Sequence, residues 1–234
     1  MRKQKSPLTI EPSILSGDFG HLGEEAKRVE EAGADALHID IMDGHFVPNL
    51  TLGPRAVAAI RRSTALFLDV HLMIYNPFDY IERFVEAGAN RITFHLEATE
   101  DVEETLNYIR RCNLEAGLAF CPDTSSSLIP KYLDKCDLLL LMTVEPGFGG
   151  QAFMPEVLEK ISFVSDLCEK LSIGKGGKVY KEKEFPPFLI QVDGGINDKT
   201  AKECVAAGAN VLVSGNYLFA APNMKEAIAG LRLS

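Results

Sequence analysis

The sequence contains one phrase three times, as EEAGADALHID at residues 30–40, VEAGANRITFH at 85–95 and VAAGANVLVSG at 205–215. In each copy an amphipathic stretch ends at a glycine, and a short run rich in branched apolar residues follows. A glycine just past the last turn is typical of the end of a helix, and branched residues favour strands. Each copy therefore predicts a helix that leads into a strand.

The spacing of the three copies predicts how many such units the chain holds. One strand with its helix needs roughly 28 residues, so the gaps between the copies correspond to two and four units, and eight units fill the chain. The predicted strands lie near 8–15, 36–42, 66–73, 90–95, 114–120, 137–143, 188–193 and 210–214. Helix-like runs between them include 20–32, 78–87, 100–112, 156–171 and 198–207.

Strict alternation of strands and helices predicts an α/β protein with a parallel sheet. Eight units predict a single (β/α)8 TIM barrel over residues 1–234, with an open doubly wound sheet as the alternative. One segment interrupts the alternation, because 174–187 is rich in Lys, Gly and Pro. We expect it to be an exposed, mobile insertion between the helix after the sixth strand and the seventh strand, away from the catalytic face.

The composition excludes several classes of protein. Of the 234 residues 46% are hydrophobic, which is typical of a globular chain, and a net charge of −9 makes nucleic acid a poor partner. The chain has no 18-residue uncharged apolar window, and its basic start, residues 1–7, lacks a signal-peptide core. We therefore expect a soluble, cytoplasmic protein with no membrane partner. Five widely spaced cysteines without a C-x-x-C pair predict reduced thiols: Cys112, Cys121, Cys136, Cys168 and Cys204.

Polar side chains gather at the ends of three predicted strands. These ends read His38-Ile-Asp-Ile-Met42, Asp69-Val-His-Leu-Met73 and Gln191-Val-Asp-Gly-Gly195. Residues two apart on a strand point to the same face, and barrel enzymes carry their sites at the carboxyl ends of the strands. Two imidazoles and two or three carboxylates at one mouth suit a divalent transition metal.

A structural interpretation competes for each of these residues taken singly. A strand-end Asp often caps the next helix, and a single His is often a satisfied polar residue of the core. His95, at the end of the fourth predicted strand, is a rival ligand. His21 and His45 fall at a helix start and in a loop.

Glycine-rich turns follow the sixth, seventh and eighth predicted strands. They read Glu145-Pro-Gly-Phe-Gly-Gly-Gln151, Asp193-Gly-Gly195 and Ser214-Gly-Asn216. Glycines let backbone N–H groups approach an anion closely, and barrels often bind phosphate after strands seven and eight. These turns therefore predict a phosphate subsite.

Five strings together give the sequence its resemblance. They are Glu11–Ser16, His38–Thr51, Asp69–Met73, Met142–Gln151 and Gln191–Ile196. With them the chain resembles the ribulose-phosphate 3-epimerase family from about residue 8 to 220. The resemblance implies epimerisation of D-ribulose 5-phosphate at C3 to D-xylulose 5-phosphate through an enediolate, in the pentose phosphate pathway. It also implies one divalent metal (Zn, Fe, Mn or Co) and a homo-oligomer.

The resemblance also assigns roles to residues. The implied metal ligands are His38, Asp40, His71 and Asp193, and Asp40 and Asp193 are also the implied acid/base pair. The residues implied to hold the sugar phosphate are Ser13, His71, Gly147, Phe148, Gly149, Gly150, Asp193, Gly194, Gly195, Gly215 and Asn216. The pocket would be lined by Met42, Met73 and Met142.

Three features depart from the family pattern, and other functions are open. Asn216 stands where the family usually has Ser, Cys121 precedes Pro122 where Asn or Lys is common, and the 174–187 insertion is unusual.

A ketohexose 6-phosphate 3-epimerase would use the same groups. A barrel decarboxylase is disfavoured, because no lysine follows Asp69 at the required position. A non-catalytic phosphosugar-binding barrel should have lost a metal or acid/base residue.

Overall fold

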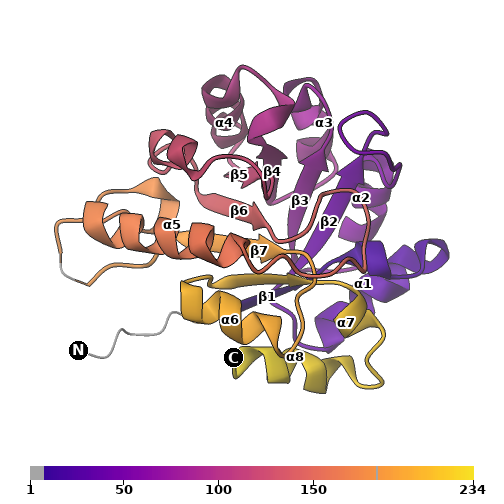
Figure 1. The fold of residues 1–234 in the computed structure, drawn as a ribbon. Coiled ribbons are helices and arrows are strands. Elements are labelled where there is room, and N and C mark those ends of the chain that lie inside the picture. The colour runs from indigo at the N-terminus through magenta and orange to yellow at the C-terminus, as the bar shows by residue number, and fades with distance from the viewer. Residues whose placement is uncertain (1–7, 183) are drawn as a thin grey trace.

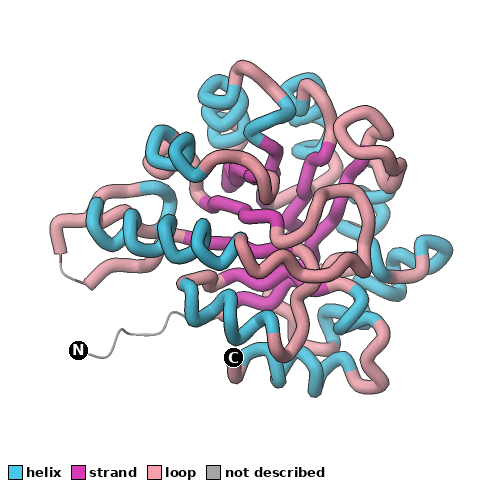
Figure 2. Tube along the Cα trace, viewed as in Figure 1, coloured by secondary structure: helices cyan, strands magenta, loops and turns pink. Residues whose placement is uncertain are grey.

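The computed structural model describes residues 8–182 and 184–234, so the basic start and Lys183 lie outside the described residues. Its strands are β1 (Thr9–Pro12), β2 (Ala36–Met42), β3 (Phe67–Met73), β4 (Arg91–His95), β5 (Glu115–Phe120), β6 (Leu138–Met142), β7 (Leu189–Asp193) and β8 (Val211–Ser214). Its helices are α1 (Leu22–Glu31), α2 (Pro54–Arg61), α3 (Ile81–Glu86), α4 (Val102–Arg111), α5 (Val157–Leu171), α6 (Thr200–Ala207), α7 (Asn216–Phe219) and α8 (Met224–Arg232). The helices surround the strands (Figures 1 and 2).

The eight strands form one parallel sheet that curls into a barrel. Each strand from β2 to β7 pairs with the next one in sequence, and β8 also pairs with β1. A parallel bridge between Ser13 and His38 joins β1 to β2. The Asp35 carboxylate accepts a hydrogen bond from the Ile10 backbone N–H at the same seam, at 2.8 Å. These contacts confirm the predicted TIM barrel and exclude the open sheet.

The period of two along each strand separates the barrel interior from the helix-covered outside. In β2, Leu37, Ile39 and Ile41 belong to the large apolar cluster between strands and helices. His38, Asp40 and Met42 alternate with them and point inward. Every residue of β2 is buried, as expected for a strand that is covered on both faces.

Two elements differ from the predicted pattern. Strand β1 ends at Pro12 rather than near residue 15, because the Ser13 side chain accepts a hydrogen bond from the Leu15 N–H and starts the short 3-10 helix Ile14–Ser16. The connection from β5 to β6 contains the 3-10 helix Ser126–Lys131 instead of an α-helix. Pro130 lies inside that segment, and proline removes a helical donor.

The 174–187 segment lies between α5 and β7, where the sequence places it, and leads into the amino-terminal end of β7. Antiparallel bridges link Ile173 to Val179 and Gly174 to Pro187, so the chain folds back on itself. Most of its described residues are exposed, although Gly174 and Gly177 are buried. Its mobility stays a prediction.

All five cysteines are free thiols, as predicted. Among the described residues, no helix combines the length and the apolar character that crossing a membrane requires.

Candidate active site

Four predicted side chains converge at the carboxyl ends of β2, β3 and β7. His38, Asp40, His71 and Asp193 each present one nitrogen or oxygen to a common point, and these four atoms all lie within 4.8 Å of one another. His71 Nδ1 is 3.0 Å from Asp40 Oδ1 and 3.4 Å from His38 Nε2. Asp193 Oδ2 is 3.9 Å from His38 Nε2.

This donor set fits a divalent transition metal. Four ligands at the usual bond lengths around a tetrahedral ion lie roughly 3.4 Å from one another, and the spacings in the cluster are of that size. Two imidazoles with two carboxylates suit zinc, iron, manganese or cobalt, which share these ligand preferences. The geometry therefore accommodates the predicted ion without naming it.

The two carboxylates of the cluster differ in protonation. Burial and the charge of Asp40 raise the pKa of Asp193 to about 7. Burial also opposes ionisation of Asp40, but its contacts with His38 and His71 outweigh that effect and lower the pKa of Asp40. The two histidines thus favour the ionised form of Asp40, and the charge of Asp40 disfavours the ionised form of Asp193.

The two histidines differ as well. Burial opposes the charged form of His38, but the carboxylates of Asp40 and Asp69 raise its pKa well above the usual value. Burial lowers the pKa of His71 to about 4. His71 is thus a neutral imidazole, which can offer a lone pair to a ligand.

Each histidine of the cluster uses its second ring nitrogen in a further buried contact. His38 Nδ1 lies 2.8 Å from Asp69 Oδ2, which also accepts a hydrogen bond from Gln191 Nε2 at 2.7 Å. His71 Nε2 lies 2.9 Å from His95 Nε2. The predicted rival ligand His95 therefore lies behind His71, outside the four-residue cluster.

A cavity of about 360 Å³ opens above the cluster. Asp40 and Asp193 line it, whereas His38 and His71 are fully buried beneath it. All the other predicted residues line the cavity: Ser13, Met42, Met73, Met142, Gly147, Phe148, Gly149, Gly150, Gly194, Gly195, Gly215 and Asn216.

The cavity has an apolar wall next to the carboxylates. Met42 and Met73 are register partners on β2 and β3, and they pack against Val47. Met142 is the register partner of Asp193. All three methionines are at most 4% exposed. They hold no exchangeable proton, so they exclude water without competing for one.

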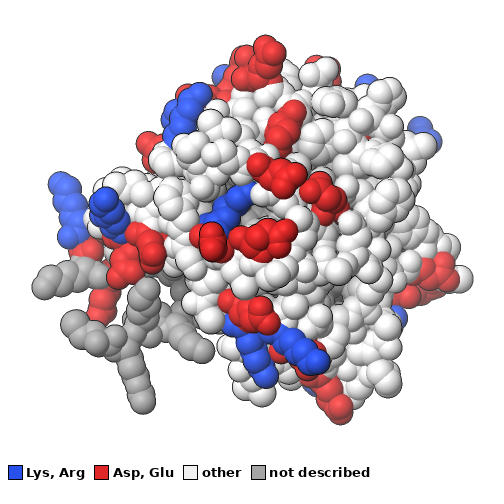
Figure 3. Space-filling model, in the orientation of Figure 1, with Lys and Arg blue, Asp and Glu red and all other residues white. Residues whose placement is uncertain are grey.

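The opposite wall is made of backbone and amide groups. Gly150 has φ +79°, and a side chain there would approach Asn216 Nδ2 to 2.8 Å. Ser16 Oγ donates a hydrogen bond to Asn216 Oδ1 at 2.6 Å, which holds the amide in place. Acidic side chains are spread across the middle of the face shown in Figure 3, with basic ones singly or in small groups among them. The groups that this wall offers to an anion are therefore the backbone N–H groups of its glycines and the Asn216 amide.

The sequence did not predict several residues that line the cavity. Leu15 and Ser16 line the cavity from the 3-10 helix Ile14–Ser16, and Tyr217 lines it from α7. The Glu11–Ser16 string contains the first two, but no role was predicted for any of the three residues. Asp69 has the spacing of a ligand, but it supports His38 from below instead. Asp69 lies two residues before His71 on the same face of β3 and therefore deeper in the barrel. This depth distinguishes a residue that supports a ligand from the ligand itself.

His21 and His45 take no part in the site. His21 is exposed at the start of α1, where its ring pairs with Asp18 at 3.0 Å. His45 is exposed in the loop after β2 and is held by Asp43. Both positions agree with the sequence interpretation.

The comparisons with known proteins decide the family. The model of the ribulose-phosphate 3 epimerase family matches residues 9–219. The chain belongs to the ribulose-phosphate 3-epimerase family. This membership confirms the resemblance and with it the expected enzyme class, an epimerase of carbohydrate phosphates.

Individual relatives match almost the whole chain. A protein of Chlamydia pneumoniae named ribulose-phosphate 3-epimerase is 51% identical over 224 residues, which cover 96% of this chain and 93% of the relative. A protein of the same name from Bacillus subtilis is 45% identical over 225 residues, which cover 96% of this chain and 98% of the relative.

A solved structure of KGPDC from Streptococcus mutans superposes with a TM-score of 0.67 at 14% identity, over 96% of this chain and 96% of that one. This similarity concerns the fold alone.

Proposed function

We propose that this protein interconverts D-ribulose 5-phosphate and D-xylulose 5-phosphate in the pentose phosphate pathway. The observation that carries the proposal is the convergence of Asp40 and Asp193 on one cavity, above two buried histidines. All four cluster positions are present, which argues against a barrel that only binds phosphosugars.

Epimerisation at C3 removes a proton next to a ketone and returns one to the opposite face of a planar enediolate. It therefore needs one group that accepts a proton and one that donates a proton. Asp40 comes from β2 and Asp193 from β7, and β1 and β8 lie between these two strands in the barrel. Their pKa values differ in the required way, with Asp40 ionised and Asp193 near neutrality. The roles exchange when the reaction runs in reverse.

A divalent metal held by His38, Asp40, His71 and Asp193 would act as a Lewis acid for the negative charge that develops on the substrate oxygens. Ser13 Oγ donates to Asp40 Oδ2 at 2.6 Å, while Asp40 Oδ1 faces His71. The hydroxyl thereby fixes the plane of this carboxylate. The three methionines keep water from the reacting carbons.

The phosphate end is the glycine and amide wall. The Gly147–Gly150 and Gly194–Gly195 turns supply backbone donors, and the Asn216 amide supplies a side-chain donor beside Gly150. Such groups bind an anion without basic side chains. This arrangement leaves the sugar chain to extend toward the two carboxylates.

The first experiment is a coupled assay on D-ribulose 5-phosphate before and after chelation, followed by addition of single divalent metals. We expect conversion that chelation stops and metal restores. A ketohexose 6-phosphate is assayed in parallel to test the related epimerase. Absence of conversion of the pentose phosphate with every metal would refute the proposal.

The acid/base pair is tested by Asp40→Asn and Asp193→Asn. Each should lower kcat by a factor of about 10³, because the amide can neither accept nor donate the proton. Asp198→Asn, an exposed change close to Asp193 in sequence, is the matched control. Metal content is measured in every variant, and near-normal turnover of a metal-loaded Asp193→Asn would eliminate the two-base mechanism.

A further inference from the structure

His71 has different partners on its two ring nitrogens. Nδ1 faces Asp40 Oδ1 and His38 Nε2, which are members of the proposed metal cluster. Nε2 faces His95 Nε2 at 2.9 Å, and the two rings stack with their centroids 5.0 Å apart. A neutral imidazole carries one proton on one nitrogen. If Nδ1 offers its lone pair to a cation, the proton is on Nε2 and points at His95.

The proton on His71 fixes the state of His95. His95 Nε2 must accept the hydrogen bond from His71, so the proton of the neutral His95 ring is on Nδ1. That nitrogen lies 3.3 Å from Glu97 Oε2 and 3.4 Å from Cys121 Sγ. His95 is fully buried, so water does not replace either partner.

Glu97 ends this chain of contacts. Its Oε1 accepts hydrogen bonds from the Cys121 N–H, at 2.9 Å, and from the Thr124 hydroxyl. Its side chain is 27% exposed, so the charge reaches solvent at the outer end of the chain. Burial opposes its ionisation, but the hydrogen bonds from His95 and Thr124 outweigh that and lower the pKa of Glu97 to about 2.

The other histidine of the cluster, His38, also contacts a carboxylate through its second ring nitrogen, but without an intervening histidine. His38 Nδ1 reaches the Asp69 carboxylate directly at 2.8 Å. Histidines that bind metals almost always donate the second ring N–H to such a partner, which fixes the tautomer and raises the basicity of the ligand. Both candidate ligand histidines thus lead to a carboxylate, and His71 reaches its own through His95.

We infer that His95 and Glu97 are positioning residues that hold His71 in the tautomer with a free Nδ1 lone pair, and so set the affinity of the cluster for its metal. This inference rests on the metal site of the proposed function. The family strings quoted above do not contain either residue. The contact between His71 and His95 is what assigns them the role.

The inference also predicts how many ions the chain binds. His95, Glu97 and Cys121 form a second group whose ligand atoms lie within 4.8 Å of one another. An ion there would need the lone pair of His95 Nδ1, which moves the proton to Nε2. Two N–H groups would then face each other between His71 and His95. Occupation of the four-residue cluster therefore excludes the second group.

The tautomers are measured directly by ¹H–¹⁵N NMR on histidine-labelled protein loaded with Zn²⁺, which is diamagnetic. The chain has five histidines, so the spectrum is simple to assign by single substitutions. We expect an Nε2–H signal for His71 and an Nδ1–H signal for His95. An Nε2–H tautomer of His95 in the loaded protein would overturn the inference.

The effect on affinity is measured by competition of the full-length apoprotein with a chelator for Zn²⁺. His95→Phe keeps a ring for stacking but removes the acceptor, and Glu97→Gln keeps the shape but removes the charge. Each should weaken Zn²⁺ binding by roughly 10- to 100-fold. Glu100→Gln, an exposed change in the same loop, should leave it unchanged. Thermal unfolding of each variant shows whether the barrel is intact.

The outcomes separate the two proposals. Failure of the wild-type protein to bind Zn²⁺ would reject the metal site itself. Tight binding by the wild type with equal affinity in His95→Phe, or two ions per chain, would reject the positioning role and leave the metal site standing. One ion per chain with weakened binding in both variants is the expected result.

Discussion

Asn216 shows how one residue shapes the wall that we propose for the phosphate. Where the family usually carries a serine hydroxyl, this chain places an amide whose Oδ1 is held by Ser16 at 2.6 Å. The Nδ2 group is thereby directed over Gly150, where any side chain would collide with it. An amide N–H donor thus replaces a hydroxyl donor at this position, and Ser16 contributes to the wall by holding the amide.

We therefore predict that Asn216→Ala raises KM for the sugar phosphate with little change in kcat. A hydrogen bond to a charged group contributes about 1.5–3 kcal/mol, so the rise should be roughly 10- to 100-fold. Steady-state kinetics and inhibition by inorganic phosphate measure it. Asn216→Ser, which restores the residue common in the family, is the control and should stay near the wild-type KM. An unchanged KM in Asn216→Ala would remove the amide from the phosphate wall.

For single residues, the sequence predicts which face of a strand each side chain occupies, because side chains alternate along a strand. Two-residue spacing places His38, Asp40 and Met42 on one face, and the structure confirms that placement. The chain from His71 through His95 to Glu97 could not be predicted, because it depends on which nitrogen faces which neighbour. Nothing in the spacing of β3 and β4 specifies that contact.

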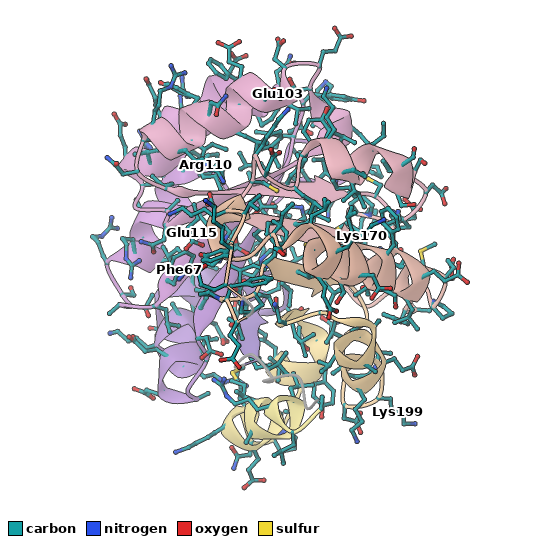
Figure 4. All side chains as sticks on the ribbon, turned by 90° about the vertical axis from the view of Figure 1, so that its left-hand side faces the viewer. Phe67, Glu103, Arg110, Glu115, Lys170 and Lys199 are labelled. Carbon is teal, nitrogen blue, oxygen red and sulfur yellow. The ribbon has the colours of Figure 1, made fainter. Side chains whose placement is uncertain are left out.

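At the scale of elements, β4 runs from a buried ionic cluster at one end of the barrel to the end that carries the cavity. Arg91, its first residue, donates to Glu115 at 2.8 Å and lies 3.3 Å from Glu11 and 3.6 Å from Asp69. Its guanidinium also stacks on Phe67, 4.9 Å from the ring centroid. Figure 4 shows Phe67 and Glu115 near each other at this end. One cation thus lies among three carboxylates, and burial together with the charge of Asp69 raises the pKa of Glu11 to about 8.

Arg91→Met should destabilise the barrel by about 3–5 kcal/mol, because it leaves buried carboxylates without their cation. Urea unfolding monitored by far-ultraviolet circular dichroism measures the change. Arg55→Met, an exposed substitution at the start of α2, is the control and should stay within about 0.5 kcal/mol of wild type. A loss below about 1 kcal/mol in Arg91→Met would mean that Glu11 and Asp69 accept neutrality at little cost.

The order of strands and helices was largely predictable, because helices that end at a glycine and strands rich in branched residues recur along the chain. The exceptions have local causes. Ser13 shortens β1 by capping a 3-10 turn, and Pro130 prevents an α-helix between β5 and β6. Both differences depend on single residues, and a periodic pattern of apolar residues does not reveal them.

For the whole molecule, the cavity and the 174–187 segment lie at opposite ends of the barrel. Strand β7 carries Asp193 at its carboxyl end, while the 174–187 segment enters at Leu189, roughly 13 Å away along the strand. The segment contacts the body through Gly176 O, which accepts from Arg110 Nη2 at 3.3 Å, and through buried Gly177. Its described contacts thus lie at the end of the barrel away from the cavity.

We predict that replacing residues 176–185 by Asn-Gly leaves kcat and KM unchanged and lowers the melting temperature. The Lys175 N–H donates to Pro186 O at 2.9 Å, so the two ends are close enough for a two-residue turn. The loss of the Arg110 hydrogen bond should cost about 1 kcal/mol. Steady-state kinetics and thermal unfolding measure the two effects, and Lys178→Ala with Lys181→Ala, which removes charge but keeps the backbone, is the control. A large fall in kcat of the folded deletion variant, absent from the control, would show that this segment acts on the active site across the length of the barrel.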